Sequence, residues 1–98
     1  MNLIVSKIGL PATLEQLAEE AAELSKAALK LARVIRAENP TPVGYCQAVD
    51  SLLEETADVR NCLNVLVDAF PSLVNTEQAE NEKLTRWLDR LEKADREG

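Results

Sequence analysis

Apolar side chains recur along residues 14–36 at alternating steps of three and four, the spacing of one face of an α-helix. Thr13 is the expected N-cap, and Gln16 would complete a capping box with it. Basic residues near the other end favour a helix C-terminus there. The pattern predicts a helix from about Leu14 to Arg36. Its apolar stripe consists of Leu14, Leu17, Ala21, Leu24, Ala28, Leu31 and Ile35.

A second stripe with the same alternation follows a run of helix breakers at residues 39–42. Thr41 as N-cap and Pro42 at the first helical position predict the start of this helix, although Gly44 could postpone it by a few residues. The helix is expected to continue to about Phe70, before Pro71. The stripe consists of Tyr45, Val49, Leu52, Thr56, Val59, Leu63, Leu66 and Phe70. Two such helices joined by a short connection predict an antiparallel hairpin.

A weaker stripe predicts a third helix from about Thr76 to Arg96. It consists of Leu84, Trp87, Leu88, Leu91 and Ala94. The expected fold is therefore a single all-α domain over residues 1–98, made of a helical hairpin and a third helix. Because three helices of this length leave wide apolar faces, we expect a four-helix or larger bundle formed by a homodimer or homotetramer.

Composition narrows the possible chemistry. Aromatic residues are only 3% of the chain, which disfavours an all-β fold, and the formal charge of −6 disfavours binding to a nucleic acid polymer. No apolar run approaches the roughly 20 residues of a membrane span. The chain has no histidine, so any acid–base or metal chemistry must rest on carboxylates. Cys46 and Cys62 would lie roughly 24 Å apart on one helix, which favours reduced thiols and a cytoplasmic location.

Both predicted long helices carry a pair of acidic residues three positions apart. The pairs are Glu20 with Glu23 and Glu55 with Asp58, and each occupies the same heptad positions relative to its stripe. In an antiparallel hairpin, residues at the same height on the two helices have residue numbers with a constant sum. The pairing of Glu20 with Asp58 and that of Glu23 with Glu55 have the same sum, which centres the turn at Asn39. Since the helix breakers independently place the turn there, the four carboxylates are expected to converge beside the helix seam.

Four clustered carboxylates repel one another unless a cation lies among them. Oxygen ligands without nitrogen or sulfur favour Mg²⁺ or Mn²⁺. A single acidic pair of this spacing is common on solvated helix faces. Two matched pairs at one predicted height favour a metal site instead. Lys30, two turns beyond Glu23 on the same face, is a candidate to bind phosphate, and an ordinary solvated lysine is an equally good interpretation.

These residues resemble the signature of the MazG-like, all-α nucleoside triphosphate pyrophosphohydrolases, which is EExxE on one helix and ExxD on the next. The matching stretches are Glu19-Glu20-Ala21-Ala22-Glu23 and Glu55-Thr56-Ala57-Asp58. The resemblance implies a helical homo-oligomer in which Glu20, Glu23, Glu55 and Asp58 bind Mg²⁺. The implied reaction converts an NTP or dNTP to the monophosphate and pyrophosphate. A carboxylate that accepts the proton of the attacking water could be Glu19, Glu23 or Glu54.

The resemblance extends in part to the third helix, where family members carry a stretch similar to KLxRNxxR. Lys83, Leu84 and Arg86 match it and imply phosphate contacts from Lys83 and Arg86. Trp87 stands where asparagine is expected, and Arg90 comes one residue late. This departure leaves a second hypothesis open, a non-catalytic helical module that keeps the fold, and with it the capacity to bind metal, and acts in regulation or assembly.

Overall fold

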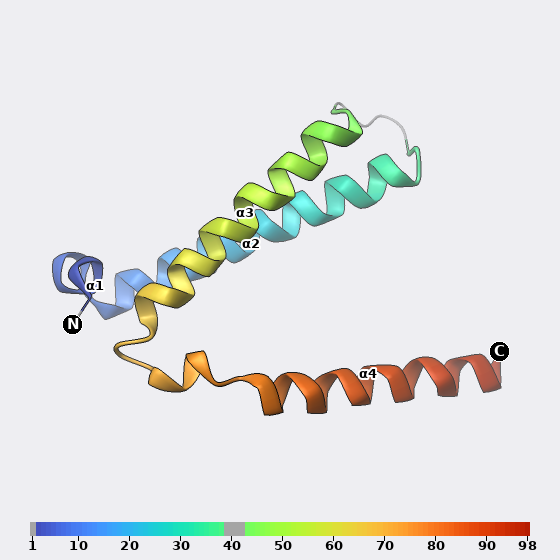
Figure 1. Ribbon diagram of the computed structural model, residues 1–98. Coiled ribbons are helices and arrows are strands. Elements are labelled where there is room, and N and C mark those ends of the chain that lie inside the picture. The colour runs from blue at the N-terminus through green and yellow to red at the C-terminus, as the bar shows by residue number, and fades with distance from the viewer. Residues whose placement is uncertain (1, 39–42) are drawn as a thin grey trace.

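A computed structural model describes residues 2–38 and 43–98, and these residues form helices without any β-strand (Figure 1). The all-α prediction is confirmed at this level. No helix in the described ranges is long and apolar enough to cross a membrane. The elements are α1 (Leu3–Ile8), α2 (Leu10–Ile35), α3 (Tyr45–Leu66), a short 3₁₀ helix η1 (Pro71–Val74) and α4 (Glu77–Glu97).

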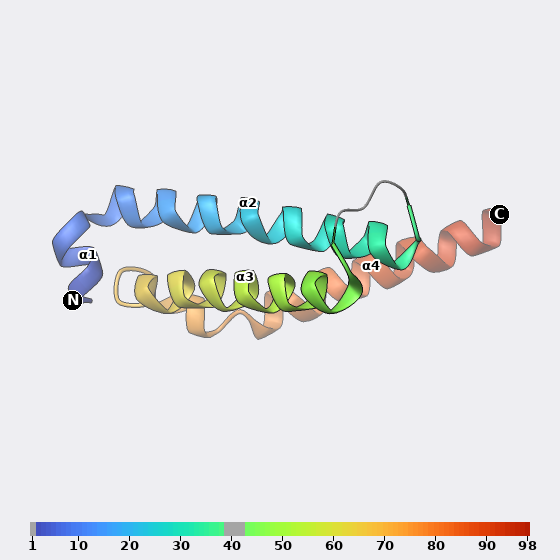
Figure 2. The same ribbon diagram turned by 90° about the horizontal axis from the view of Figure 1, so that it is seen from above.

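Helix α1 is not predicted by the sequence pattern. It is capped by Asn2, whose side chain accepts a hydrogen bond of 2.8 Å from the Ile4 N–H. The helix lies across the open end of the α2–α3 hairpin and contacts both long helices, with Val5 buried (Figure 2). Six residues are too few to show helical periodicity, which explains why the stripes do not reveal this element.

Helix α2 begins at Leu10, so the prediction of an N-cap at Thr13 is wrong. Gly9 is the N-cap, with φ +88° and ψ 158°, and it turns the chain from α1 into α2. The Thr13 side chain is buried, and its hydroxyl donates a hydrogen bond of 2.8 Å to the Gly9 carbonyl oxygen. Gln16 does not complete a capping box, because the Thr13 N–H already donates to the Gly9 carbonyl oxygen; the Gln16 side-chain amide donates to Glu20 instead.

Helix α3 has Gly44 as its N-cap, in agreement with the expected delay at this glycine. The predicted turn at Asn39 and the predicted cap at Thr41 and Pro42 lie outside the described residues. The helix ends at Leu66, four residues before the predicted end, and the N–H groups of Ala69 and Phe70 then donate to the Leu66 carbonyl. Pro71 disfavours helical backbone at Phe70, which has φ −131° and ψ 77°, so the helix does not continue to the predicted end.

Only one half of each predicted stripe lies in the seam between α2 and α3. Leu17, Leu24 and Leu31 are half-buried there, as predicted. The other seam positions lie one residue before the predicted ones, at Thr13, Glu20, Ala27 and Val34 of α2 and Ala48, Glu55 and Cys62 of α3. The predicted stripe residues that lie outside the seam form a second surface, which we call the apolar face of the hairpin. It consists of Leu14, Ala21, Ala28 and Ile35 of α2 with Tyr45, Val49 and Leu63 of α3.

Helix α4 diverges from the hairpin and packs against none of the other described helices (Figure 1). As a result the chain is extended, with a radius of gyration of 17.5 Å, whereas a compact domain of this length has about 13 Å. Its accessible surface is 7721 Å², compared with about 5,500 Å² for a compact monomer of 10.8 kDa. One chain therefore forms the hairpin but leaves the third predicted helix without a packing partner.

The turn at Gly9 provides a test of the α1–α2 connection. The Gly9→Ala variant places a Cβ in a backbone region that only glycine adopts readily, so the free energy of unfolding should fall by about 1–3 kcal/mol. Gly44→Ala is the matched control. Gly44 is also a helix N-cap, but it has φ −79° with open space around a built Cβ, so its substitution should cost only the preference of the cap position for glycine over alanine, less than about 1 kcal/mol. Urea unfolding measures both, and equal effects would contradict the assigned role of Gly9.

Candidate metal centre

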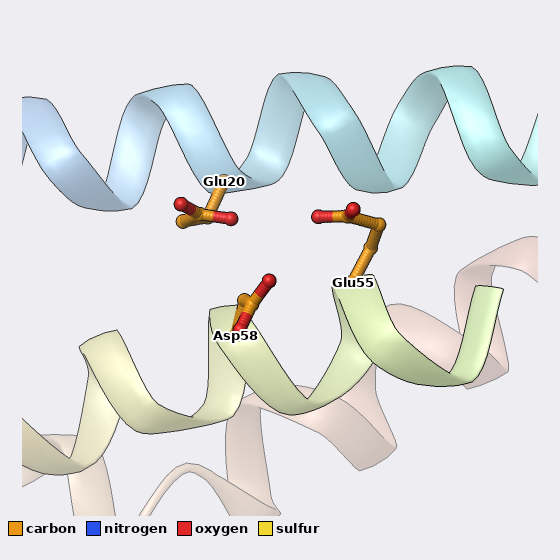
Figure 3. A group of neighbouring side chains, drawn as sticks. All are labelled: Glu20, Glu55 and Asp58. Carbon is orange, nitrogen blue, oxygen red and sulfur yellow. The ribbon is translucent and has the colours of Figure 1, made fainter. Parts of the chain in front are cut away.

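Three of the four predicted carboxylates meet between α2 and α3. Glu20 projects from α2 toward Glu55 and Asp58 of α3 (Figure 3). One oxygen atom from each residue lies within 4.8 Å of the other two. Glu20 and Glu55 are half-buried and Asp58 is exposed, so the cluster is open to solvent on one side. We call these three residues the carboxylate cluster.

Small seam neighbours give the two glutamates room. Glu20 stands seven residues from Thr13 and from Ala27, both of which are buried in the seam. Glu55 stands seven residues from the buried Ala48 and from the half-buried Cys62. Residues seven apart lie almost directly above one another on a helix, so each carboxylate occupies a gap between small side chains.

Electrostatic repulsion within the cluster is only partly relieved. The Gln16 side-chain amide donates a hydrogen bond of 2.8 Å to Glu20. No lysine or arginine of the described ranges forms an ion pair with the three carboxylates. Desolvation raises the pKa of Glu55 above its ordinary value, and repulsion from Asp58 and then Glu20 raises it further. The cluster therefore carries negative charge that no side chain compensates, and a bound cation or a proton would neutralise it.

Glu23, the fourth predicted ligand, is directed elsewhere. Its carboxylate lies 3.3 Å from the ammonium nitrogen of Lys26, and both side chains are largely exposed. Glu23 still contributes to the raised pKa of Glu55, so it is close enough to act on the cluster electrostatically. An exposed ion pair of this kind is weak, at about 0.2–1 kcal/mol, and a bound cation could compete with Lys26 for Glu23.

The remaining predicted residues take varied positions. Glu19 and Glu54 are exposed on the outer surfaces of the hairpin helices, and Lys30 is half-buried on α2. Lys83 and Arg86 lie on α4, which does not pack against the hairpin, so a single chain does not bring them to the carboxylates. They share one side of α4 with Trp87 and Arg90.

A small apolar cavity of about 120 Å³ lies beside the cluster, and the sequence analysis does not predict it. It lies between α1 and the hairpin, and its lining consists of Ile4, Ile8, Thr13, Gln16, Asn61, Cys62 and Val65. Gln16 and Cys62 each stand one helical turn from a carboxylate of the cluster. The cavity depends on α1, and the signal that could have revealed α1 is Asn2 as a cap before an apolar run.

Cys46 and Cys62 are both free thiols, as expected from their spacing. Desolvation raises the pKa of the Cys62 thiol, and the negative charges of Glu20 and Asp58 raise it further. The thiol is therefore protonated at neutral pH, which is consistent with a packing role and not with a reactive thiolate.

Comparison with known proteins adds no relative, because no family model, curated protein or solved structure matches this chain. The chemistry of the cluster must be judged from its own atoms. Carboxylate oxygens from two helices, open to solvent on one side, suit a hard divalent cation that keeps some of its water. The residues present thus fit Mg²⁺ or Mn²⁺.

The raised pKa of Glu55 gives stability a defined dependence on pH. Because this pKa is higher in the folded state than in the unfolded state, the folded state binds more protons between the two values. Ionised Glu55 therefore destabilises the metal-free protein at pH 7, and this penalty disappears as the pH falls toward about 4.5. Glu55→Gln should be more stable than the wild type at pH 7, and the difference should shrink as the pH falls toward about 4.5.

Urea unfolding without divalent cations between pH 7 and pH 4.5 measures this difference. Glu15→Gln, on the exposed surface of α2, is the matched control and should show no such convergence with the wild type. A difference between wild type and Glu55→Gln that stays constant or grows toward pH 4.5 would contradict the described electrostatics.

Proposed function

We propose that this protein is a Mg²⁺-dependent nucleoside triphosphate pyrophosphohydrolase that acts as a homo-oligomer in the cytoplasm. The observation that carries the proposal is the convergence of Glu20, Glu55 and Asp58 within 4.8 Å. These are three of the four positions that the EExxE and ExxD resemblance assigns to metal binding. No lysine or arginine of the described ranges forms an ion pair with these carboxylates, which supports the same interpretation.

In the proposed reaction, water attacks the α-phosphorus, the bond between the α-phosphorus and its bridging oxygen breaks, and pyrophosphate leaves. Glu20, Glu55 and Asp58 would hold Mg²⁺, with Glu23 as a fourth ligand once it leaves Lys26. When bound, Mg²⁺ supplies charge neutralisation for the triphosphate and lowers the pKa of coordinated water. A carboxylate that is not fully committed to the metal would accept the proton of the attacking water. The candidates are Glu19, Glu54 and, as long as it is not a metal ligand, Glu23.

The assignment of a nucleotide as the substrate rests on the family resemblance. The cavity that begins one helical turn away is apolar and, at about 120 Å³, smaller than a typical ligand pocket of about 300–1,000 Å³, so a base or sugar would have to lie on the open side of the cluster. Lys30 is the basic candidate on the hairpin itself. Lys83 and Arg86 stay in the proposal through the family resemblance and would have to reach the phosphates by a movement of α4 or from another subunit.

The separation of α4 from the cluster also favours a second candidate function. Trp87 replaces the expected asparagine, and a single chain leaves the basic residues of α4 far from the carboxylates. A helical module that binds a divalent cation without hydrolysing nucleotides would act in regulation or assembly. It should show a rise in melting temperature with Mg²⁺ but no turnover.

Release of pyrophosphate from a panel of NTPs and dNTPs with Mg²⁺ or Mn²⁺ tests the activity. Glu55→Gln and Asp58→Asn should lower turnover by at least about 100-fold, since even the outer partners of metal ligands contribute roughly 10- to 100-fold. Glu15→Gln is the control and should keep full activity. A lack of turnover with every nucleotide would reject the hydrolase and leave the metal-binding module.

Lys26 and Mg²⁺ would compete for the Glu23 carboxylate, and this competition can be tested without an activity assay. Lys26→Met should tighten Mg²⁺ binding by up to about fivefold, because it removes the competing ion pair. Lys93→Met, which breaks a comparable exposed pair with Glu97 on α4, is the matched control and should leave the affinity unchanged. Titration calorimetry measures the affinities.

The effect of Lys26→Met should vanish when Glu23→Gln is already present, because no carboxylate is then released. An equal gain in both backgrounds would show that Lys26 acts only through its charge, and it would remove Glu23 from the ligand set.

A further inference from the structure

The three carboxylates of the cluster differ in the hydrogen bonds that they accept. Among the side-chain hydrogen bonds of residues 2–38 and 43–98, one reaches the cluster, and it runs from Nε2 of Gln16 to Oε1 of Glu20 over 2.8 Å. The other side-chain bonds of these ranges involve neither Glu55 nor Asp58. In the described part of the chain, Glu20 is therefore the one member of the cluster whose two oxygen atoms are distinguished by a neighbouring side chain.

The two oxygen atoms of Glu20 point in different directions. One is directed toward Glu55, and the other points the opposite way along α2, toward the N-terminal end of the helix (Figure 3). Gln16 stands one helical turn before Glu20, so its amide approaches from that N-terminal side. The hydrogen bond thus occupies the oxygen that is turned away from Glu55 and leaves the other oxygen free to face the cluster.

The surroundings of Gln16 set this bond apart from an ordinary bond on a helix surface. Gln16 lines the apolar cavity beneath α1 together with residues of that helix, so one side of its side chain lies against protein. Gln78 makes the same kind of bond to Glu82 on α4, but that bond is longer, at 3.2 Å, and α4 packs against no other described helix. The position at the cavity wall thus limits the freedom of the Gln16 amide and favours its bond to Glu20.

Divalent cations differ in how they use a carboxylate. Mg²⁺ requires nearly octahedral geometry with bonds of about 2.0–2.1 Å, and it keeps several of its water molecules. Ca²⁺ takes about 6–8 oxygen ligands at roughly 2.3–2.6 Å and accepts both oxygens of one carboxylate. A glutamate with one oxygen already bonded to an amide offers a single oxygen to an ion. Such a ligand suits Mg²⁺ better than Ca²⁺, because Ca²⁺ has to give up one ligand atom or break the hydrogen bond.

We propose that Gln16 is a positioning residue that sets the ion selectivity of the carboxylate cluster. By holding one oxygen of Glu20, it presents the other oxygen alone to the ion, which favours Mg²⁺ over Ca²⁺. Because the glutamine amide is neutral, it orients the carboxylate without cancelling the negative charge that attracts the ion. A lysine at this position would cancel part of that charge. The proposal rests on the metal centre of the proposed function and not on the hydrolysis of nucleotides.

Titration calorimetry with Mg²⁺ alone and with Ca²⁺ alone tests this role in Gln16→Met, which removes the donor but keeps the length of the side chain. The Mg²⁺ affinity should fall about tenfold, the lower end of the roughly 10- to 100-fold that outer partners of metal ligands contribute. The Ca²⁺ affinity should stay the same or rise. Gln78→Met is the matched control, because it removes the corresponding bond to Glu82 on α4 and should leave both affinities unchanged. The melting temperature without metal should be the same in both variants as in the wild type.

Gln16→Lys separates the hydrogen bond from its charge. Lysine still donates to Glu20 but adds a positive charge, so both ions should bind more weakly while the ratio of Mg²⁺ to Ca²⁺ affinity stays near that of the wild type. An equal loss of selectivity in Gln16→Lys and Gln16→Met would overturn the proposal, and so would an unchanged ratio in Gln16→Met when the wild type binds Mg²⁺. The metal centre would survive either result. A wild type that binds neither ion would reject the metal centre itself, and with it the role of Gln16.

Discussion

The interaction on which the structure and its site depend is the packing of α2 against α3, because it holds Glu20, Glu55 and Asp58 together against their mutual repulsion. Packing of α2 on α3 gains free energy from the leucines of the seam, and the same packing forces three carboxylates together. Small neighbours such as Ala27 and Ala48 allow this approach without steric cost. Any cation that binds the folded cluster and not the unfolded chain must therefore stabilise the fold.

The two sides of the hairpin differ in chemistry. One side carries Glu23, Asp58 and the cavity beneath α1. The other side is the apolar face, whose stripe positions on α2 carry no acidic residue. Because each long helix contributes one edge to both sides, a single seam fixes the position of the carboxylates relative to the apolar face.

The sequence predicts the carboxylate cluster well because three constraints coincide. Matched heptad positions, equal height across the hairpin and a turn near Asn39 all place Glu20 opposite Glu55 and Asp58. The orientation of the Glu23 side chain could not be predicted in this way. Lys26 lies three residues further along the same helix and offers Glu23 a local ion pair. The free energy of such an exposed pair is small, so residue spacing alone does not show whether Glu23 pairs with Lys26 or joins the cluster.

Other parts of the fold were predicted less well for different reasons. The stripe of α2 is wider than one contact, so its spacing could not show that Leu17 faces the seam while Leu14 faces outward. Thr13 resembles an N-cap only if α1 is overlooked, and the short α1 has no periodicity to reveal it. The stripe of α4 shows that one side of this helix needs a cover, but it does not state whether the same chain or another provides it.

Diffraction from crystals grown with Mn²⁺ tests the central claim most directly, because manganese gives anomalous scattering that locates the ion without assumptions. The carboxylate cluster should show an anomalous peak coordinated by oxygens of Glu20, Glu55 and Asp58 at bond lengths typical of a hard divalent ion. Glu23 should turn from Lys26 toward the same ion. A cluster free of anomalous density at saturating Mn²⁺, with the three carboxylates splayed apart, would contradict the assignment of a metal centre.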